Sequence, residues 1–291
     1  MYERILVPLD SSELAERALP FAEGLARKLH GEVILLTAHI LGDPFERLLR
    51  AYLEKRVVEL QSLGIRASSL VVEGNAANEI LDFSEKNGIG LIIISSHGRA
   101  GPSIWPLGSV ANKVLQRSRI PVLLIRSGQL EEVIAERELQ KILVTLDGSQ
   151  FAEEIISYVE GLAKEMGSEI ILLRVIEPIK FPYLETYDAE CERYEKDFMA
   201  RAEKEARHYL SKKENTLRDK GVKVSSTLLI GKPAETILQY ARDNSASLIA
   251  LATHGFSGIT KWAYGSIASK LIERSPKPIL LVRPPLPGLD T

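Results

Sequence analysis

The chain alternates between short runs of consecutive apolar residues and longer stretches in which apolar residues recur every three or four positions. The short runs predict β-strands near residues 4–9, 32–38, 66–73, 90–95 and 121–126. The longer stretches between them predict helices near residues 12–30, 44–63, 76–87 and 109–118. Because the strands are apolar throughout rather than alternately polar, we expect a parallel sheet that is covered by helices on both faces.

The same order of blocks returns in the second part of the chain. Residues 4–12 reappear as residues 141–149, at an offset of 137 residues. The pair Gly108-Ser109 reappears as Gly265-Ser266, at an offset of 157 residues. The second copy therefore carries 20 extra residues, which we place in its second helix, near residues 189–220. Its strands are predicted near residues 141–146, 169–176, 222–230, 247–252 and 278–283.

This repeat predicts two tandem, doubly wound α/β domains of Rossmann-like type. Each would hold a five-stranded, mainly parallel sheet with helices on both faces. We place copy one at residues 1–127 and copy two at residues 139–285. Gly128 and a run of charged residues lie between the copies, and a proline-rich tail from Pro284 onward ends the second.

Composition narrows the classes of partner. The chain holds 37 basic and 39 acidic residues, so it lacks the basic excess of a general nucleic-acid binder. Its longest apolar runs have the length of strands, which predicts no membrane span. The single cysteine, Cys191, cannot form an internal disulfide, and the first strand begins too early for a signal peptide. We therefore expect a cytoplasmic protein.

Candidate chemistry gathers at one edge of each predicted sheet. In open α/β sheets, ligands bind beyond the carboxyl ends of the strands. Asp10 and Asp147 directly follow the first strand of each copy, and Ala38 and Val175 end the second strand. The aspartates therefore lie where a ligand would bind, although the sequences around them also suit the start of a helix.

A long loop follows the fourth strand in each copy. In copy one, Gly98 is followed by nine residues and then by Gly108-Ser109, which opens a helix; Gly255 and Gly265-Ser266 repeat this spacing in copy two. A helix N-terminus presents unpaired amides and partial positive charge, and glycine lets backbone approach a phosphate closely. Helix capping alone explains a single Gly-Ser, but two at identical spacing favour a phosphate site.

With these residues, the chain resembles the universal stress protein family in its tandem two-domain form, over essentially its whole length. The signature Ile-Leu-Val-Pro-Leu-Asp-Ser-Ser and the motif Gly-x2-Gly-x9-Gly-Ser/Thr carry the resemblance. It implies a fold like that of the adenine nucleotide α-hydrolases and binding of ATP, often with a divalent ion such as Mg²⁺. The residues it nominates in copy one are Pro8, Asp10, Ala38, Ser95, Gly98, Arg99, Gly108, Ser109 and Val110. In copy two they are Asp147, Val175, Ala252, Gly255, Gly265, Ser266 and Ile267.

The family also pairs domains through the last strand, so residues 122–126 and 279–283 are expected to pair within the chain as a pseudo-dimer. Association of two chains into a homodimer is implied as well. The chain departs from the motif at its first glycine, which is Ser95 in copy one and Ala252 in copy two. A negative φ would tolerate both residues, whereas a positive φ would strain them. Because Pro102 and Pro106 stiffen the loop of copy one, we rank copy two as the better site.

Three functions stay open at this point. ATP would act as a structural or regulatory ligand in a stress response; alternatively the protein is a scaffold without nucleotide, or an ATP-using enzyme with Arg99 at the phosphates. The chain lacks the P-loop motif and the Gly-x-Ser-x-Gly elbow, and its histidines lack metal-ligand spacing. His97 and His254 are expected to be hydrogen-bonded turn residues. We assign no catalytic residue and expect at most weak ATP hydrolysis.

Overall fold

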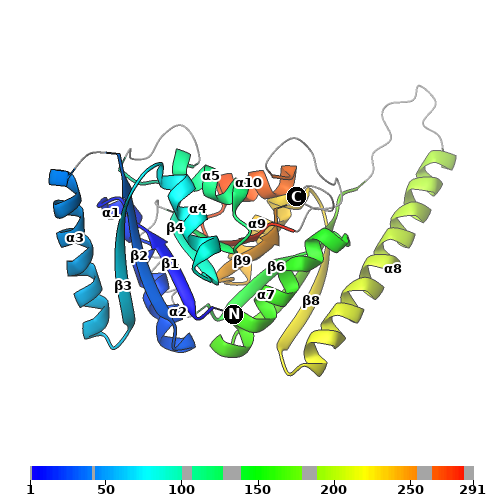
Figure 1. Ribbon diagram of the computed structural model, residues 1–291. Helices are drawn as coiled ribbons and strands as arrows, with labels where there is room; N and C mark the ends of the chain where they lie inside the picture. The colour runs from blue at the N-terminus through cyan, green and yellow to red at the C-terminus, as the bar shows by residue number, and fades with distance from the viewer. Residues whose placement is uncertain are drawn as a thin grey trace.

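Ten strands form one continuous sheet in the order β3-β2-β1-β4-β5-β10-β9-β6-β7-β8 (Figure 1). The structure, a computed structural model, describes residues 2–40, 43–99, 107–126, 139–178, 189–253 and 264–284. The segment between the two predicted copies, residues 128–138, lies outside the described residues, as do His254, Gly255, Pro102 and Pro106.

The elements follow the predicted order in both copies. Copy one contains β1 (Arg4–Pro8), α1 (Glu13–Glu16), α2 (Leu19–Leu29), β2 (Glu32–His39), α3 (Asp43–Ser62), β3 (Arg66–Glu73), α4 (Ala76–Lys86), β4 (Leu91–Ser95), α5 (Ser109–Arg117) and β5 (Val122–Ile125). Copy two contains β6 (Lys141–Thr145), α7 (Gln150–Met166), β7 (Glu169–Ile176), α8 (Ala189–Asp219), β8 (Lys223–Ile230), α9 (Pro233–Asp243), β9 (Leu248–Ala252), α10 (Ser266–Arg274) and β10 (Ile279–Val282).

The two halves join at the centre of the sheet. Each half is parallel throughout, and β5 pairs with β10 antiparallel, with Leu123 opposite Leu280. The predicted pairing of the last strands within one chain is confirmed. Both leucines are 1% exposed, so the junction is part of the core.

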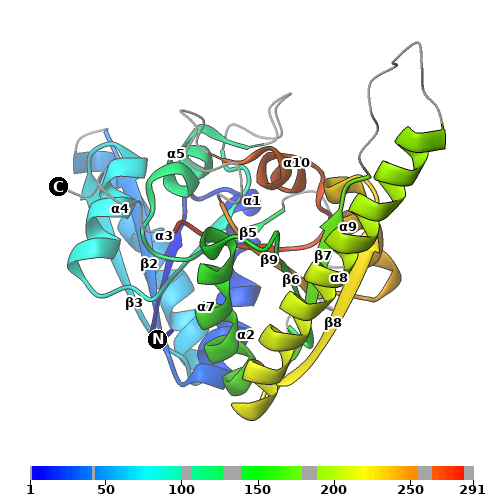
Figure 2. The same ribbon diagram turned by 90° about the vertical axis from the view of Figure 1, so that its right-hand side faces the viewer.

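Helices cover both faces of the sheet, and each face has its own apolar core. On one face, α2, α3, α7 and α8 pack over residues such as Phe21, Leu53 and Val159. On the other, α4, α5, α9 and α10 pack over residues such as Ile80 and Leu271. The two copies also meet away from the strands, because α2 and α7 lie side by side (Figure 1 and Figure 2).

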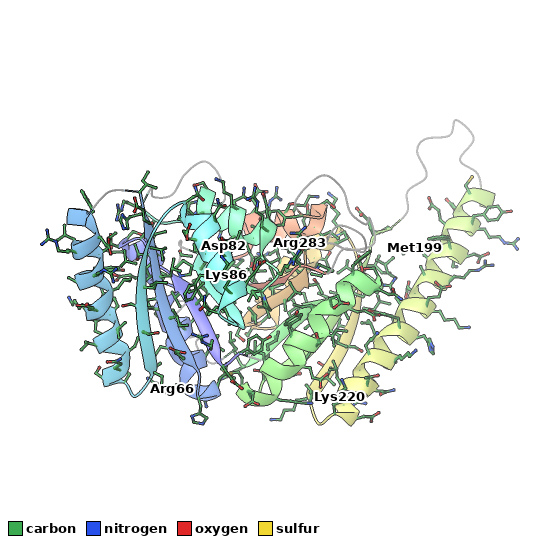
Figure 3. The ribbon with its side chains drawn as sticks, viewed as in Figure 1. Arg66, Asp82, Lys86, Met199, Lys220 and Arg283 are labelled. Carbon is green, nitrogen blue, oxygen red and sulfur yellow. The ribbon has the colours of Figure 1, made fainter. Side chains whose placement is uncertain are left out.

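The junction is also bound through two matching arginines. Arg126, after β5, donates from Nη1 to the carbonyl of Ile272 in the last turn of α10, at 2.9 Å. Arg283, after β10, donates to the carbonyl of Gln116 in the last turn of α5, at 3.2 Å (Figure 3). Carbonyls at helix C-termini lack partners within the helix and carry partial negative charge. Each half thus supplies a cation to a helix end of the other.

One predicted helix is wrong. The stretch 12–30 forms two helices, α1 and α2, which are separated at Arg17 and Ala18. Pro20 lies in the first turn of α2, where proline is tolerated. Inside one continuous helix over 12–30 it would have no amide to donate and would collide with the carbonyl of Glu16. The corresponding helix of copy two, α7, has Ser157 at this position and is unbroken.

The extra residues of copy two lengthen α8 to 31 residues. Figure 3 shows Lys220 just past its lower end and Met199 in its upper half. At the lower end, Lys220 donates to Glu160 of α7 at 2.7 Å. None of the described helices has the length and apolar character needed to span a bilayer.

Candidate nucleotide-binding site

Each half has a pocket at the carboxyl edge of its sheet, where the nominated residues meet. The pocket of copy one has a volume of about 160 Å³ and that of copy two about 360 Å³. The residues nominated from the sequence that line them are Pro8, Asp10, Ala38, Ser95, Gly98, Arg99, Gly108, Ser109 and Val110 in copy one, and Asp147, Val175, Ala252, Gly265, Ser266 and Ile267 in copy two. Gly255 lies outside the described residues.

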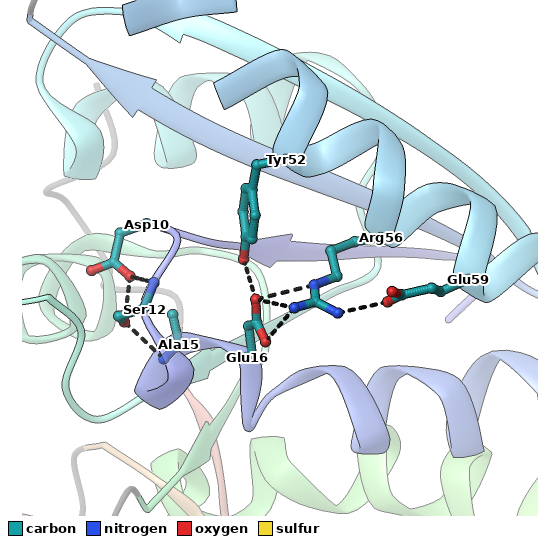
Figure 4. Close-up of polar contacts among 7 residues, drawn as sticks. All are labelled: Asp10, Ser12, Ala15, Glu16, Tyr52, Arg56 and Glu59. Carbon is teal, nitrogen blue, oxygen red and sulfur yellow. Dashed lines mark hydrogen bonds and ion pairs between the residues drawn. The ribbon is translucent and has the colours of Figure 1, made fainter. Parts of the chain in front are cut away.

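In copy one, Asp10 organises the turn between β1 and α1 (Figure 4). Its Oδ1 accepts hydrogen bonds from the amide of Ser12, at 3.1 Å, and from the Ser12 hydroxyl, at 2.5 Å. The helix cap itself is Ser12, whose Oγ accepts from the amide of Ala15 at 3.2 Å. The second oxygen of Asp10, Oδ2, faces the loop after β4.

Arg99 closes this end of the pocket. Its amide donates to Asp10 Oδ2 at 2.6 Å, and its Nη2 donates to the carbonyl of Asp10 and to Ser11 Oγ, both at 2.7 Å. The loop therefore crosses the aspartate so closely that a β-carbon at Gly98 would collide with Asp10 Oδ2. The Arg99 guanidinium thus lies at the aspartate end of the pocket.

Copy two builds the same turn with different neighbours. The amide of Ser149 donates to Asp147 Oδ1 at 2.9 Å, and Ser149 caps α7. Gly148 has a φ of +92°, and Ser11 at the matching position of copy one has a φ of +64°. Arg174 on β7 packs against Gly148 and lies 5.4 Å from the centre of the Tyr209 ring. Both aspartate turns therefore have an arginine beside them, supplied by different elements.

Each pocket is also lined by a helix start without a side-chain cap. Gly108 and Gly265 are the N-cap residues of α5 and α10, and neither start has a side-chain cap hydrogen bond. Their amides donate to the carbonyls of Ser96, at 2.7 Å, and Thr253, at 2.9 Å. The next amides of each helix have no partner within the helix, so each start offers donors and partial positive charge to an anion.

The two departures from the glycine motif are accommodated without strain. Ser95 and Ala252 end β4 and β9, and neither is among the described residues with a positive φ. Ser95 is only 5% exposed, and its hydroxyl has no hydrogen-bond partner in the described part of the chain. A buried hydroxyl without a partner is unfavourable unless a ligand or water satisfies it. Since Ser95 lines the pocket of copy one, its hydroxyl is available to a ligand there.

Some residues that line the pockets were not predicted from the sequence. Leu36 and Ile80 line the pocket of copy one, and Leu173 and Ile237 line that of copy two. They belong to the apolar faces of strands and helices, so their pattern indicates core packing rather than a ligand. His97 is buried, and its Nδ1 lies 3.1 Å from Ser96 Oγ, as expected of a hydrogen-bonded turn histidine.

A half-buried polar cluster lies at the end of the helix that follows the aspartate turn. Glu16, at the end of α1, accepts a hydrogen bond from the Tyr52 hydroxyl at 2.8 Å and from Arg56 Nη2 at 2.9 Å (Figure 4). Burial, reinforced by Glu16, raises the pKa of Tyr52. Copy two has Glu153, Tyr209 and Lys213 at the matching positions, with Lys213 paired to Glu153 at 2.5 Å. Each cluster ties the helix after the aspartate to the helix that follows the second strand.

Known proteins share this sequence pattern. The profile of the universal stress protein family matches residues 1–126 and 138–283. The chain belongs to the universal stress protein family. A universal stress protein of Methanocaldococcus jannaschii is 26% identical over 153 residues, which are 50% of this chain and 94% of that protein. The universal stress protein YxiE of Bacillus subtilis is 28% identical over 148 residues, 43% of this chain and 100% of that protein.

The fold agrees with a solved member of the family. The crystal structure of a universal stress protein from Archaeoglobus fulgidus superposes with a TM-score of 0.72 and 20% sequence identity. The match covers 97% of this chain and 99% of that chain, so the tandem arrangement extends through both proteins.

Proposed function

We propose that each half of this universal stress protein binds an adenine nucleotide, with ATP as the ligand, and that the nucleotide acts as a structural or regulatory ligand in the stress response. The observation that carries the proposal is the recurrence of one pocket in both halves. In each, a carboxylate-bearing turn and a helix start without a side-chain cap line the same pocket. This pairing suits a ligand with a hydroxyl-bearing sugar and an anionic chain.

The division of roles follows from the chemistry of the residues that line the pocket. Asp10 and Asp147 are hydrogen-bond acceptors, which suits the hydroxyl groups of a ribose. The apolar walls beside them, including Leu36 and Leu173, suit a base. The amides at the starts of α5 and α10 suit phosphates. In copy one, the unpartnered hydroxyl of Ser95 supplies a further hydrogen bond to the ligand.

A regulatory ligand fits the chain better than a substrate. The phosphates would neutralise the starts of α5 and α10, whose opposite ends receive Arg283 and Arg126 from the other half. Nucleotide binding would thus act on helices that connect both copies. We assign no protein ligand to Mg²⁺, which would arrive with the phosphates. We also propose a division into domains at 1–127 and 139–285, a cytoplasmic location and a homodimer.

Titration calorimetry with ATP tests the proposal in three proteins: the natural chain, Gly108→Glu and Gly265→Glu. Each substitution places a carboxylate at one helix start, where it repels phosphate and occupies the site. We expect two sites in the natural chain and one in each variant. If the natural chain binds no ATP, the alternative of a scaffold without nucleotide replaces this proposal. ATP turnover stimulated by a carboxylic acid would instead favour the adenylating enzyme.

A further inference from the structure

A second hollow adjoins the nucleotide pocket of copy two. This basic groove, about 390 Å³ in volume, is lined mainly by residues of α9 and α10 and of the segment before α9, among them Lys232, Lys270 and Arg274. Pro233, Ser266 and Ile267 also line the nucleotide pocket, so the two hollows share a wall. The groove runs between α9 and α10, and from Ser266 to Arg274 it follows α10 for about 12 Å at the usual rise per residue.

Three cations line the groove without partners of their own. The side chains of Lys232, Lys270 and Arg274 make no ion pair or hydrogen bond with the residues that the structure describes. Glu177 and Glu235 also line it, which leaves a net positive lining. Such a mixture attracts a small free anion weakly, but it favours phosphates that are already held at the mouth of the groove.

Two helix starts meet at the same place. Neither α9, which begins after Lys232, nor α10, which begins after Gly265, has a side-chain cap hydrogen bond. Copy one differs at the matching position, because Asn75 caps α4 by accepting from the amide of Asn78 at 3.4 Å. An uncapped start and a lysine in copy two thus replace a capped start and a neutral side chain in copy one.

We propose that the basic groove binds the outer phosphates of a nucleotide held in copy two, so that copy two selects its ligand by the length of the phosphate chain. This inference rests on the proposed nucleotide site. The phosphate nearest the ribose lies at the start of α10, and the following phosphates extend past Lys232 toward Lys270. Each further phosphate comes close to additional positive charge, from a lysine or from the start of a helix. Copy one lacks the lysine and discriminates less.

The test measures dissociation constants of AMP, ADP and ATP by calorimetry in the Gly108→Glu background, where only copy two binds. In Lys232→Ala, the ratio of the AMP to the ATP dissociation constant is expected to fall by about threefold to tenfold, because one charge contact to the outer phosphates is lost. AMP affinity should stay unchanged. Lys223→Ala is the control, since this exposed lysine begins β8 at the opposite edge of the sheet.

The reverse experiment uses copy one in the Gly265→Glu background. Asn75→Lys should raise its preference for ATP over AMP relative to Asn75→Ala, which loses the same helix cap. If the parent protein binds no nucleotide in copy two, the proposed function fails there. If it binds ATP but Lys232→Ala leaves the ratio unchanged, the nucleotide site stands and the basic groove has no role in selecting chain length.

Discussion

At the scale of single residues, two glycines next to the aspartates are required for different physical reasons. Gly98 is needed because the backbone passes so close to Asp10 that no β-carbon fits. Gly148 is needed because its φ of +92° strains any residue with a β-carbon. The first requirement is steric and the second conformational, so their substitutions have different controls.

We predict that Gly98→Ala disrupts the turn of copy one. The added methyl displaces either Asp10 or the Arg99 loop, which should destabilise the protein by about 1–3 kcal/mol, the range of overpacking. ATP affinity of copy one, measured in the Gly265→Glu background, should fall as well. Gly161→Ala is the control, because nothing lies within 4 Å of its added β-carbon in the middle of α7. That variant should be about 0.5–1 kcal/mol more stable by helix propensity.

Gly148→Ala is predicted to destabilise copy two. The left-handed backbone costs alanine about 1–2 kcal/mol, and the new methyl would also displace the Arg174 guanidinium. At the matching position of copy one, the natural Ser11 already has a β-carbon. Ser11→Ala should therefore lower the free energy of unfolding by less than about 1 kcal/mol, mainly through loss of the hydrogen bond from Arg99. Urea unfolding of both variants measures the difference. Equal losses would contradict a conformational role for Gly148.

The sequence predicted the aspartates and the Gly-Ser pairs because their chemistry is local. An aspartate that follows a strand and a glycine that precedes a helix can be recognised within a few residues. The contact of Arg99 with Asp10 joins residues 89 positions apart, and Arg174 reaches Gly148 from another strand. Neither contact has a pattern of its own along the chain, so only the folded arrangement brings them together.

At the scale of elements, the apolar pattern predicted the strands well and one helix wrongly. Strands in a sheet that is covered on both faces are continuous apolar runs, which are easily recognised. The periodicity of residues 12–30 continues across the break between α1 and α2, because both helices pack their apolar faces on the same core. Pro20 was the available signal, since proline is tolerated in the first turn of a helix and not inside one.

A pH dependence follows from the contact between α7 and the end of α8. Hydrogen bonds from Lys164 and Lys220 lower the pKa of Glu160. A carboxyl whose pKa is lower in the folded protein contributes stability above its unfolded pKa, near 4.3, and this contribution is lost as the pH falls through the folded pKa. We expect Glu160→Gln to lose less stability than the natural chain between about pH 5 and pH 3.

Urea unfolding at several pH values between these limits measures this difference. Glu165→Gln is the control, because this exposed carboxyl of the same helix has no ion pair or hydrogen bond among the described residues. Its stability should follow the natural chain at each pH. A parallel acid response of Glu160→Gln and the natural chain would show that the lysine contacts contribute no stability.

At the scale of the whole molecule, the family resemblance predicted that the last strands pair, and their pairing makes the sheet continuous. The reciprocal bonds of Arg126 and Arg283 could not be predicted, because their acceptors are backbone carbonyls, which every residue has. Such bonds depend on where a helix ends relative to the other half. The two arginine bonds thus join the halves through polar contacts, in addition to the apolar junction of β5 and β10.

The continuous sheet predicts that the two halves unfold together. Trp105 and Trp262 lie one in each copy, so Trp105→Phe and Trp262→Phe leave one fluorescent reporter per half. Because β5 and β10 share buried partners, we expect coincident urea transitions from the two reporters. Leu280→Ala, which opens a cavity at the junction, should lower both midpoints together by a loss of about 2–5 kcal/mol. Two separate transitions, or a shift in copy two alone, would mean that each half folds as an independent unit and that the junction only joins them.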